Sequence, residues 1–553
     1  MPCGGQVIDR DGEVEGAHGA AIAPPRALRY GQAMPARRIA AFQRYRALCA
    51  FLLGAISATG FAPLGLWPLT ILALAALLHL LSQAAKSRTA LWLGWLFGLG
   101  YFTVGLAWIA QAFTYQAKMP PWLGWMAVPL LSLYLAVYPA LAAACAHRLA
   151  RQMESNRPLL FALFFAATWI VTEWLRAWVF TGFAWNPLAA IAPWAAAPTR
   201  IIGTYGMGGL ILLLSGSVTL FACGQRKAAL WLAALLALFW GGATFALALT
   251  APQTNRPPID VTIVQPNIDQ GDKWDMAQRR ANFAKLAAHS SRRGANPRLL
   301  LWPEAAVPDY VEDGYPPYWY DEPPAFVRAR LAAQLGPGDM LLTGAVKLIP
   351  NGAGDDVVGA RNAVFALDDQ GRLVTRYDKS HLVPYGEYLP MRPILSRLGL
   401  SRLAPGDIDF WPGPGARTLN LGRFGRAGLQ ICYEIIFSGQ VVDQGNRPDF
   451  IFNPSNDAWF GAWGPPQHLA QARLRAVEEG LPVLRATPTG ISAIIAPDGR
   501  ILHALPMHHA GRIDARVPLA FAPTPFARFG NILPLAFAIF LIASAIVFGR
   551  NHR

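Results

Sequence analysis

One cysteine of this sequence stands apart from the other four. Those four lie in a polar N-terminal tail or inside long apolar segments, whereas Cys432 is alone in the more polar region between residues 251 and 528. A cysteine without a possible disulfide partner is either inert packing or a nucleophile. Packing is the commoner role of a free cysteine, so the residues that accompany Cys432 must decide.

Two other ionisable residues share its position relative to predicted strands. Each of the three follows a short β-rich run: Leu299–Leu301 before Glu304, Leu373–Tyr377 before Lys379, and Ala427–Ile431 before Cys432. The ends of strands are where α/β sheets assemble sites, because the sheet fixes the backbone while the following turn exposes the side chain. We therefore expect the three side chains to meet.

Together these residue types can perform acyl transfer through sulfur. A thiol attacks well only as a thiolate, so it needs a base, and Glu304 can take its proton and later return it. Lys379 can supply positive charge that favours the thiolate and holds the oxyanion of a tetrahedral intermediate. Each residue alone is more often a solvated surface group, but three in equivalent positions favour catalysis.

Charge and hydropathy place this chemistry beside a membrane. The chain is 54% hydrophobic and only 15% charged, with a net charge of +15. Residues 251–520 carry 28 Lys and Arg against 27 Asp and Glu, so almost all of the excess lies in the apolar remainder. Basic residues that flank apolar segments indicate membrane topology, and nucleic acid is not expected as a partner.

Eight apolar segments approach the ~20 residues that a helix needs to cross a bilayer. They are 47–63, 66–84, 90–113, 121–146, 158–180, 201–223, 228–250 and 530–549. Loops rich in basic residues alternate with loops that hold little more than Lys118 and Arg200. The basic loops contain Lys86 and Arg88, then Arg148, Arg151 and Arg157, then Arg226 and Lys227, and finally Arg550 and Arg553. Under the positive-inside rule both termini are cytoplasmic and residues 251–528 lie outside the membrane, which in bacteria means the periplasm.

The domain organisation follows from these patterns. Residues 1–45 read as a disordered cytoplasmic extension, 46–250 as seven transmembrane helices, 251–528 as a catalytic domain, and 529–553 as an eighth helix with a short tail. In the third of these regions short β-rich runs alternate with helical stretches at 276–292, 324–335 and 466–479, which indicates a layered α/β domain. Within the fifth span, Glu173 and Arg176 read as a pair that neutralises itself, although a polar functional site was the alternative.

Three separated motifs resemble the nitrilase, or carbon–nitrogen hydrolase, superfamily. They are Trp302-Pro303-Glu304, the segment from Asp378-Lys379-Ser380-His381 to Pro384-Tyr385-Gly386-Glu387-Tyr388, and Ile431-Cys432-Tyr433-Glu434. The long lysine segment, the eight spans and Ser455-Asn456-Asp457-Ala458-Trp459-Phe460 resemble a membrane-embedded branch whose members acylate lipoproteins. The likeness covers nearly everything from about residue 45 to the last helix.

The resemblance implies an αββα sandwich and a role for each matching residue. Glu304 would be the base, Lys379 the electrostatic stabiliser and Cys432 the nucleophile. Glu387 would orient Lys379 or assist proton transfer, while Tyr433 and Glu434 would shape the site. The matching substrate-binding positions are Trp274, Asn362 and Trp459. Pro488 departs from the resemblance, because asparagine is expected there, which puts one side-chain contact near the site in doubt.

The resemblance also implies a reaction in two halves. Cys432 would take an acyl chain from a membrane phospholipid as a thioester. The free α-amine of a diacylglyceryl-modified cysteine, at the N-terminus of an apolipoprotein, would then accept it. No cofactor or metal is expected, since the ten histidines lack ligand spacing and neither a G-x-S-x-G elbow nor a P-loop occurs. The protein is expected to act as a monomer in the bacterial inner membrane.

Two rival functions and one structural question stay open at this point. A membrane-tethered amidase could use the same triad, although seven upstream spans would then be idle. A transporter or scaffold could carry a domain that has lost catalysis. Aromatic and apolar side chains in 310–326, 382–412 and 454–466 could line a lipid-facing mouth or simply pack on one another.

Overall fold

The computed structural model describes residues 45–550, apart from 116–119, 154–157, 254–256, 293, 400 and 404–407. The predicted extension over residues 1–45 lies outside the described residues except for Tyr45. Lys118, Arg157 and Arg553, which entered the prediction of topology, also lie outside them.

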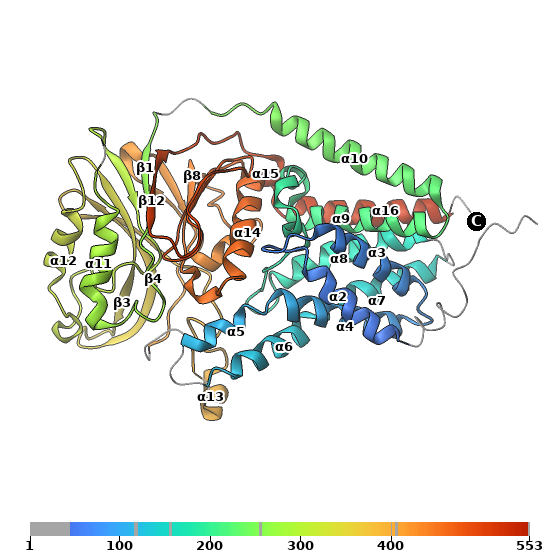
Figure 1. The fold of residues 1–553 in the computed structure, drawn as a ribbon, viewed down its shortest axis with the longest axis horizontal. Coiled ribbons are helices and arrows are strands. Elements are labelled where there is room, and N and C mark those ends of the chain that lie inside the picture. The colour runs from blue at the N-terminus through green and yellow to red at the C-terminus, as the bar shows by residue number, and fades with distance from the viewer. Residues whose placement is uncertain are drawn as a thin grey trace, which may run out of the picture. The chain divides into compact units, whose positions relative to one another are not determined.

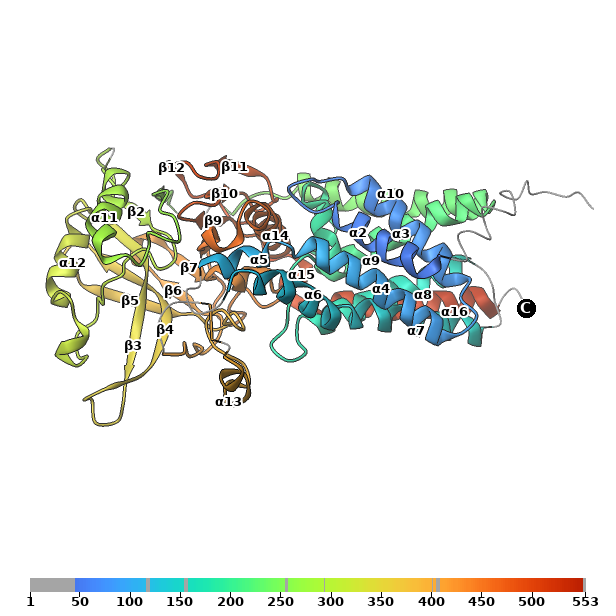
Figure 2. The ribbon, with the colours of Figure 1, turned by 60° about the horizontal axis from the view of Figure 1, so that its bottom comes forward.

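Apolar helices pack side by side in the first half of the chain, and the last helix joins them (Figures 1 and 2). They are α2 (Arg46–Ala58), α3 (Trp67–Ser82), α4 (Ser87–Gly105), α5 (Ile109–Ala112), α6 (Leu123–Leu135), α7 (Val137–Gln152), α8 (Pro158–Arg176), α9 (Thr199–Ala222), α10 (Arg226–Ala248) and α16 (Ile532–Arg550). Helix α4 packs on α2 and α7, α8 packs on α7 and α9, and α16 packs on both α8 and α9.

Helices occupy all eight predicted spans, but their lengths differ. Five helical segments in the described chain are long and apolar enough to cross a membrane, counting α6 and α7 together as Leu123–Gln152. A sixth results if α4 and the segment Ile109–Tyr115, bent by 51° from it, form one broken span. Helices α2 and α3 have only 13 and 16 residues. The prediction of a multi-pass helical region is confirmed, and the number eight is not.

Two six-stranded sheets form the second half. The first has the strand order β12-β1-β2-β3-β4-β5, and the second has the order β11-β10-β9-β8-β7-β6. The first sheet comprises β1 (Asp260–Gln265), β2 (Arg298–Leu301), β3 (Met340–Pro350), β4 (Val357–Asp368), β5 (Leu373–Asp378) and β12 (Gly511–Arg516). The second comprises β6 (Thr418–Asn420), β7 (Arg426–Leu429), β8 (Phe450–Pro454), β9 (Val483–Ala486), β10 (Ala493–Ile495) and β11 (Ile501–Ala504).

The two sheets pack face to face, because alternate side chains of their strands point to the two faces of each sheet and the inner ones form a shared apolar core. In β2, Leu299 and Leu301 belong to a core shared with Phe452 of the second sheet, whereas Leu300 faces the other way. That other face is covered by α11 (Arg279–Ala288) and α12 (Pro324–Ala332), whereas α14 (Gly464–Glu479) contacts β9 of the second sheet (Figure 1). The expected αββα sandwich is confirmed.

A buried polar joint ties the sandwich to the apolar helices. The Glu478 carboxylate in α14 accepts hydrogen bonds from the backbone N–H and the hydroxyl of Thr204 in α9, both at 2.6 Å, and from the Ser438 hydroxyl at 2.7 Å. Within the helices, Arg176 and Glu173 lie 3.7 Å apart and both are buried, as the predicted self-neutralising pair requires.

Helix α9 is broken at Gly203, directly before Thr204. Gly203 has φ +66° and ψ 176°, a backbone conformation that favours glycine, and a Cβ there would collide with the ring of Phe526. We predict that Gly203→Ala costs about 1–3 kcal/mol of stability, from backbone strain and overpacking. Thermal unfolding in detergent measures this loss. Gly241→Ala in α10, where a Cβ meets nothing within 4 Å, is the matched control and should not destabilise. Equal unfolding midpoints for the two variants would contradict the prediction.

Candidate active site

The structure brings Glu304, Lys379 and Cys432 together in the interior. Glu304 lies three residues after β2, Lys379 directly follows β5, and Cys432 begins the 3₁₀ turn η8 (Cys432–Ile436) beyond β7. Their exposed fractions are 6%, 1% and 4%. The Lys379 Nζ is 3.6 Å from the Glu304 Oε1, and the charges of both side chains act on the Cys432 thiol.

Lys379 is held between two carboxylates. Its Nζ lies 3.0 Å from Oε2 and 3.1 Å from Oε1 of Glu387, in addition to the contact with Glu304. Burial alone would lower the pKa of Lys379, but the charges of Glu387 and Glu304 outweigh it and raise this pKa above its ordinary value. Lys379 is therefore a fixed cation beside the thiol. Glu387 lies where it can orient that cation.

Both oxygens of Glu304 are fixed by donors. Oε1 accepts from the Asn362 side-chain amide at 2.7 Å, and Oε2 accepts from the backbone N–H of Asn456 at 2.7 Å. The same amide of Asn362 donates to Glu387 at 2.9 Å. Asn362 thus lies between the two carboxylates, and a carboxylate held in this way keeps one orientation toward the thiol.

The Cys432 thiol is protonated at rest. Burial raises the pKa of this thiol well above its usual value and the Glu304 carboxylate raises it further, whereas the Lys379 cation lowers it. The residue has φ +49°, in the left-handed region, so the chain turns sharply at the sulfur. Ionisation of this thiol is therefore disfavoured unless a neighbouring group takes its proton.

The carboxylate of Glu434, two residues after Cys432, holds the cysteine turn in place. Glu434 Oε1 accepts from the Tyr377 and Ser380 hydroxyls and from the backbone N–H groups of Ser380 and His381, while its Oε2 accepts from the Ile431 N–H at 2.7 Å. Glu434 therefore locks the cysteine turn to the segment that carries Lys379.

Tyr433 reaches the segment after α8 in the apolar half. Its hydroxyl donates to the Gly182 carbonyl at 3.2 Å, and its ring packs on Phe183 and Phe437. The neighbouring His381 contacts the Thr181 carbonyl through Nε2 at 2.7 Å. The nucleophile turn is thus directly connected to the helical part of the chain.

The remaining predicted binding residues lie farther out. Trp274 is 38% exposed and its ring lies 5.9 Å from the Lys273 Nζ. Trp459 packs edge-on against Tyr115, with ring centroids 5.8 Å apart. Trp459 is partly buried, and the roles of both residues stay predictions.

In the segment 310–326, Tyr310, Tyr315 and Tyr320 form ring contacts with one another and belong to one buried cluster. Tyr318 and Phe326 of the same segment are 68% and 69% exposed. Trp411 and Trp463 in the other two segments are 43% and 40% exposed. Packing therefore explains only part of the first segment, and all three segments keep exposed aromatic surface.

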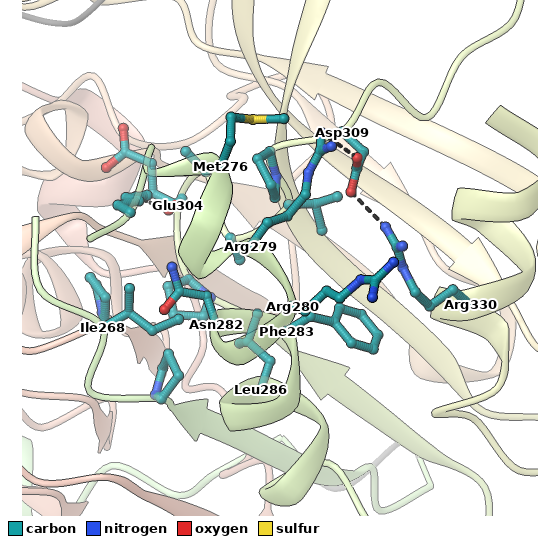
Figure 3. A pocket seen from close by; sticks show the side chains of 18 of the residues that line it. Ile268, Met276, Arg279, Arg280, Asn282, Phe283, Leu286, Glu304, Asp309 and Arg330 are labelled. Atoms are coloured by element: carbon teal, nitrogen blue, oxygen red, sulfur yellow. Dashed lines mark hydrogen bonds and ion pairs between the residues drawn. The ribbon is translucent and has the colours of Figure 1, made fainter. Parts of the chain in front are cut away.

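A cavity of about 630 Å³ borders the backbone side of Glu304 (Figure 3). Its walls are α11, the segment 303–309, Lys273 and Pro488. Asp309 bridges Arg279 and Arg330 at 2.6 Å each across this cavity. At the unexpected Pro488, the backbone carbonyl accepts from the Asn267 N–H at 2.8 Å, so this position contributes through its main chain.

The sequence patterns missed Lys273. Its Nζ donates to the Glu304 carbonyl at 2.9 Å, and burial lowers its pKa to about 8, although the charges of Glu304 and Cys432 oppose this shift. The sequence signal that could have found Lys273 is its position directly before Trp274, a predicted binding residue. The patterns also missed a buried cluster of Asp457, His468 and Arg485 behind the cysteine, which no sequence spacing indicates.

Comparisons with known proteins agree with this geometry. The family model described as the apolipoprotein N-acyltransferase N-terminal domain matches residues 53–217, and the carbon-nitrogen hydrolase model matches residues 260–522. An apolipoprotein N-acyltransferase of Rhodopseudomonas palustris is 34% identical over 530 residues, covering 91% of this chain and 95% of that protein. One from Caulobacter vibrioides is 36% identical over 516 residues, covering 91% and 94%.

The chain belongs to the apolipoprotein N-acyltransferase family. Among solved structures, Saccharomyces cerevisiae Nit3, a member of the nitrilase superfamily, is 20% identical and covers 47% of this chain and 90% of its own, with a TM-score of 0.33. The assignment therefore rests on the family matches and the full-length relatives. As a family member the chain is an acyltransferase with a nitrilase-like domain, and its apolar helices agree with a membrane protein.

Proposed function

We propose that this protein transfers an acyl chain from a membrane phospholipid to the free α-amine of the diacylglyceryl-cysteine at the N-terminus of an apolipoprotein. The observation that carries the proposal is the position of Cys432. The charges of Glu304 and Lys379 act on its thiol, while the next residue, Tyr433, is hydrogen-bonded to Gly182 of the apolar half. A site so placed suits substrates that are held in a bilayer.

In the first half-reaction Glu304 takes the proton of Cys432, and the thiolate attacks the ester carbonyl of the phospholipid. Lys379 stabilises the negative charge that develops on the carbonyl oxygen. The C–O ester bond then breaks, and the lysophospholipid alcohol leaves with the proton from Glu304. Cys432 is left as a thioester.

In the second half-reaction the neutral α-amine of the lipoprotein attacks the thioester carbonyl. Glu304 accepts a proton from this nitrogen, the C–S bond breaks, and the proton returns to the sulfur. An amide forms from a thioester downhill, so no nucleotide is required. Burial of Cys432 keeps water from the thioester, which would otherwise be hydrolysed.

The supporting residues take roles that follow from their contacts. Glu387 and Asn362 hold Lys379 and Glu304, and Glu434 with Tyr433 fixes the cysteine turn. The rings of Trp274 and Trp459 contact the lipid parts of the substrates.

The topology that suits this reaction is the one that the basic loops indicate. Eight crossings place the catalytic domain, residues 251–528, in the periplasm, with residues 46–250 and 529–553 in or beside the inner membrane. In that arrangement the broken or short helices α2, α3 and α4–α5 each count as a crossing. The protein acts as a monomer and needs no cofactor or metal.

Mass spectrometry of the intact protein tests the proposed chemistry. After incubation with phospholipid vesicles, a fatty-acyl adduct should appear on Cys432, and a lipopeptide with a free N-terminal amine should remove it with a matching gain in peptide mass. A membrane-tethered amidase would instead form adducts from small amides and none from phospholipid. That result would overturn the proposed acyl donor.

A further inference from the structure

A fully buried group of three ionisable side chains lies behind the nucleophile: Asp457, His468 and Arg485, each with an exposed fraction of 1% or less. Arg485 Nη2 is 2.5 Å from Asp457 Oδ2 and 2.9 Å from His468 Nδ1. His468 Nδ1 is also 3.0 Å from Asp457 Oδ1. The proposed reaction uses none of the three.

One contact fixes a hydrogen on Nε2 of His468. Its Nε2 lies 3.0 Å from the Cys432 carbonyl, which can only accept, so Nε2 carries a hydrogen. Burial, followed by the Arg485 cation, lowers the pKa of His468, although Asp457 opposes them. Nδ1 lies between Arg485 Nη2 and Asp457 Oδ1, and Asp457 neutralises Arg485.

The same group reaches Glu304 from the other side. Asp457 directly follows Asn456, whose backbone N–H donates to Glu304 Oε2 at 2.7 Å. Arg485 also donates to the Ser455 hydroxyl at 3.2 Å, within the same turn. The Cys432 carbonyl and the Glu304 carboxylate are therefore connected through the hydrogen bonds of His468, Arg485 and Asp457 and the peptide link from Asp457 to Asn456.

We infer that His468 is a positioning residue, which holds the left-handed Cys432 turn through its carbonyl and, with Asp457 and Arg485, sets the sulfur at a fixed distance from Glu304. The inference rests on the proposed function. A proton-accepting role for His468 does not fit, because its Nε2–H faces a carbonyl oxygen. Cys432, Asp457 and His468 could offer ligand atoms to a metal, but Arg485 already supplies the positive charge at Asp457 and His468.

Two amide variants separate positioning from packing. Glutamine can place its amide nitrogen where His468 Nε2 lies, whereas the shorter asparagine reaches only the Nδ1 position. We expect the rate of acyl-adduct formation with phosphatidylethanolamine vesicles to stay within about tenfold of wild type in His468→Gln, since one hydrogen bond is kept in altered form. In His468→Asn it should fall about 100-fold, because the nucleophile is no longer held in place.

The unfolding midpoints of both variants should fall by similar amounts, since both lose the same ring. Exposed His503 in β11 provides the control, and His503→Gln should match wild type. Equal adduct rates in the Gln and Asn variants would overturn the inference. Loss in His468→Gln as complete as in Cys432→Ser would overturn it as well, because His468 would then take part in the chemistry. If wild-type protein forms no adduct, the proposed function fails instead.

Discussion

Replacing Cys432 by serine should abolish acyl transfer, with a loss of at least about 10³-fold in rate. Serine fills nearly the same space, so the turn and its hydrogen bonds to His468 and Glu434 remain. A hydroxyl, however, is a far weaker acid than a thiol, and Glu304 cannot deprotonate it effectively. The measurements are the mass of the acyl adduct and the N-acylation of lipoproteins in cells that depend on this protein.

Exposed cysteines of the same chain provide matched controls. Cys145 and Cys223 are free and exposed, and their serine variants should keep wild-type activity. Lipoprotein N-acylation that persists in Cys432→Ser cells would remove the nucleophile from the mechanism and favour a scaffold or transporter.

Replacing Glu304 by glutamine should lower the rate of acyl-adduct formation by about 10³-fold, the contribution of a well-placed general base. The change also conflicts with the local hydrogen bonds. Both oxygens of Glu304 face donors, from Asn362 and from the Asn456 N–H, and a glutamine has one oxygen and one NH₂ group. One donor must then face another, and the side chain turns.

The residual activity of Glu304→Gln should rise with pH. Burial holds the pKa of the Cys432 thiol well above its usual value, so below that pKa the thiolate fraction grows about tenfold per pH unit. Wild type should show a weaker dependence, because Glu304 removes the proton locally. Glu322→Gln, near the same cavity but hydrogen-bonded to Arg330, should behave as wild type. A flat pH profile in Glu304→Gln would contradict the role of base.

Patterns local in sequence were sufficient to predict the strands that carry the site. β2, β5 and β7 are short runs with strand character that end shortly before a chemical group, and each forms at its predicted place within a few residues. The layered domain follows from such runs alternating with amphipathic helices. The proximity of Glu304, Lys379 and Cys432 was an inference from equivalent positions at strand ends, and the structure places them together.

What the sequence did not predict depends on contacts between distant segments. β9 contains Arg485, an unpromising residue for a buried strand, and its burial is made tolerable by Asp457 and His468, together with hydrogen bonds to Asn453 and Ser455. In the sequence Lys273 is one lysine in a polar loop, and folding brings its Nζ within hydrogen-bond distance of the Glu304 carbonyl. The count of eight spans is not confirmed at α2 and α3, because hydropathy marks apolar runs but does not fix where a helix ends, here at Ala58 and Ser82.

The hydrogen bonds of Glu478 affect whether the sandwich domain can be separated from the apolar helices. Its carboxylate accepts donors from Thr204 on one side and Ser438 on the other. Excising the sandwich, or exchanging it for one without this carboxylate, would leave the buried Thr204 N–H without its acceptor, at a cost of about 1–3 kcal/mol. The two halves are therefore not interchangeable modules, and changes on one side of the joint must be matched on the other.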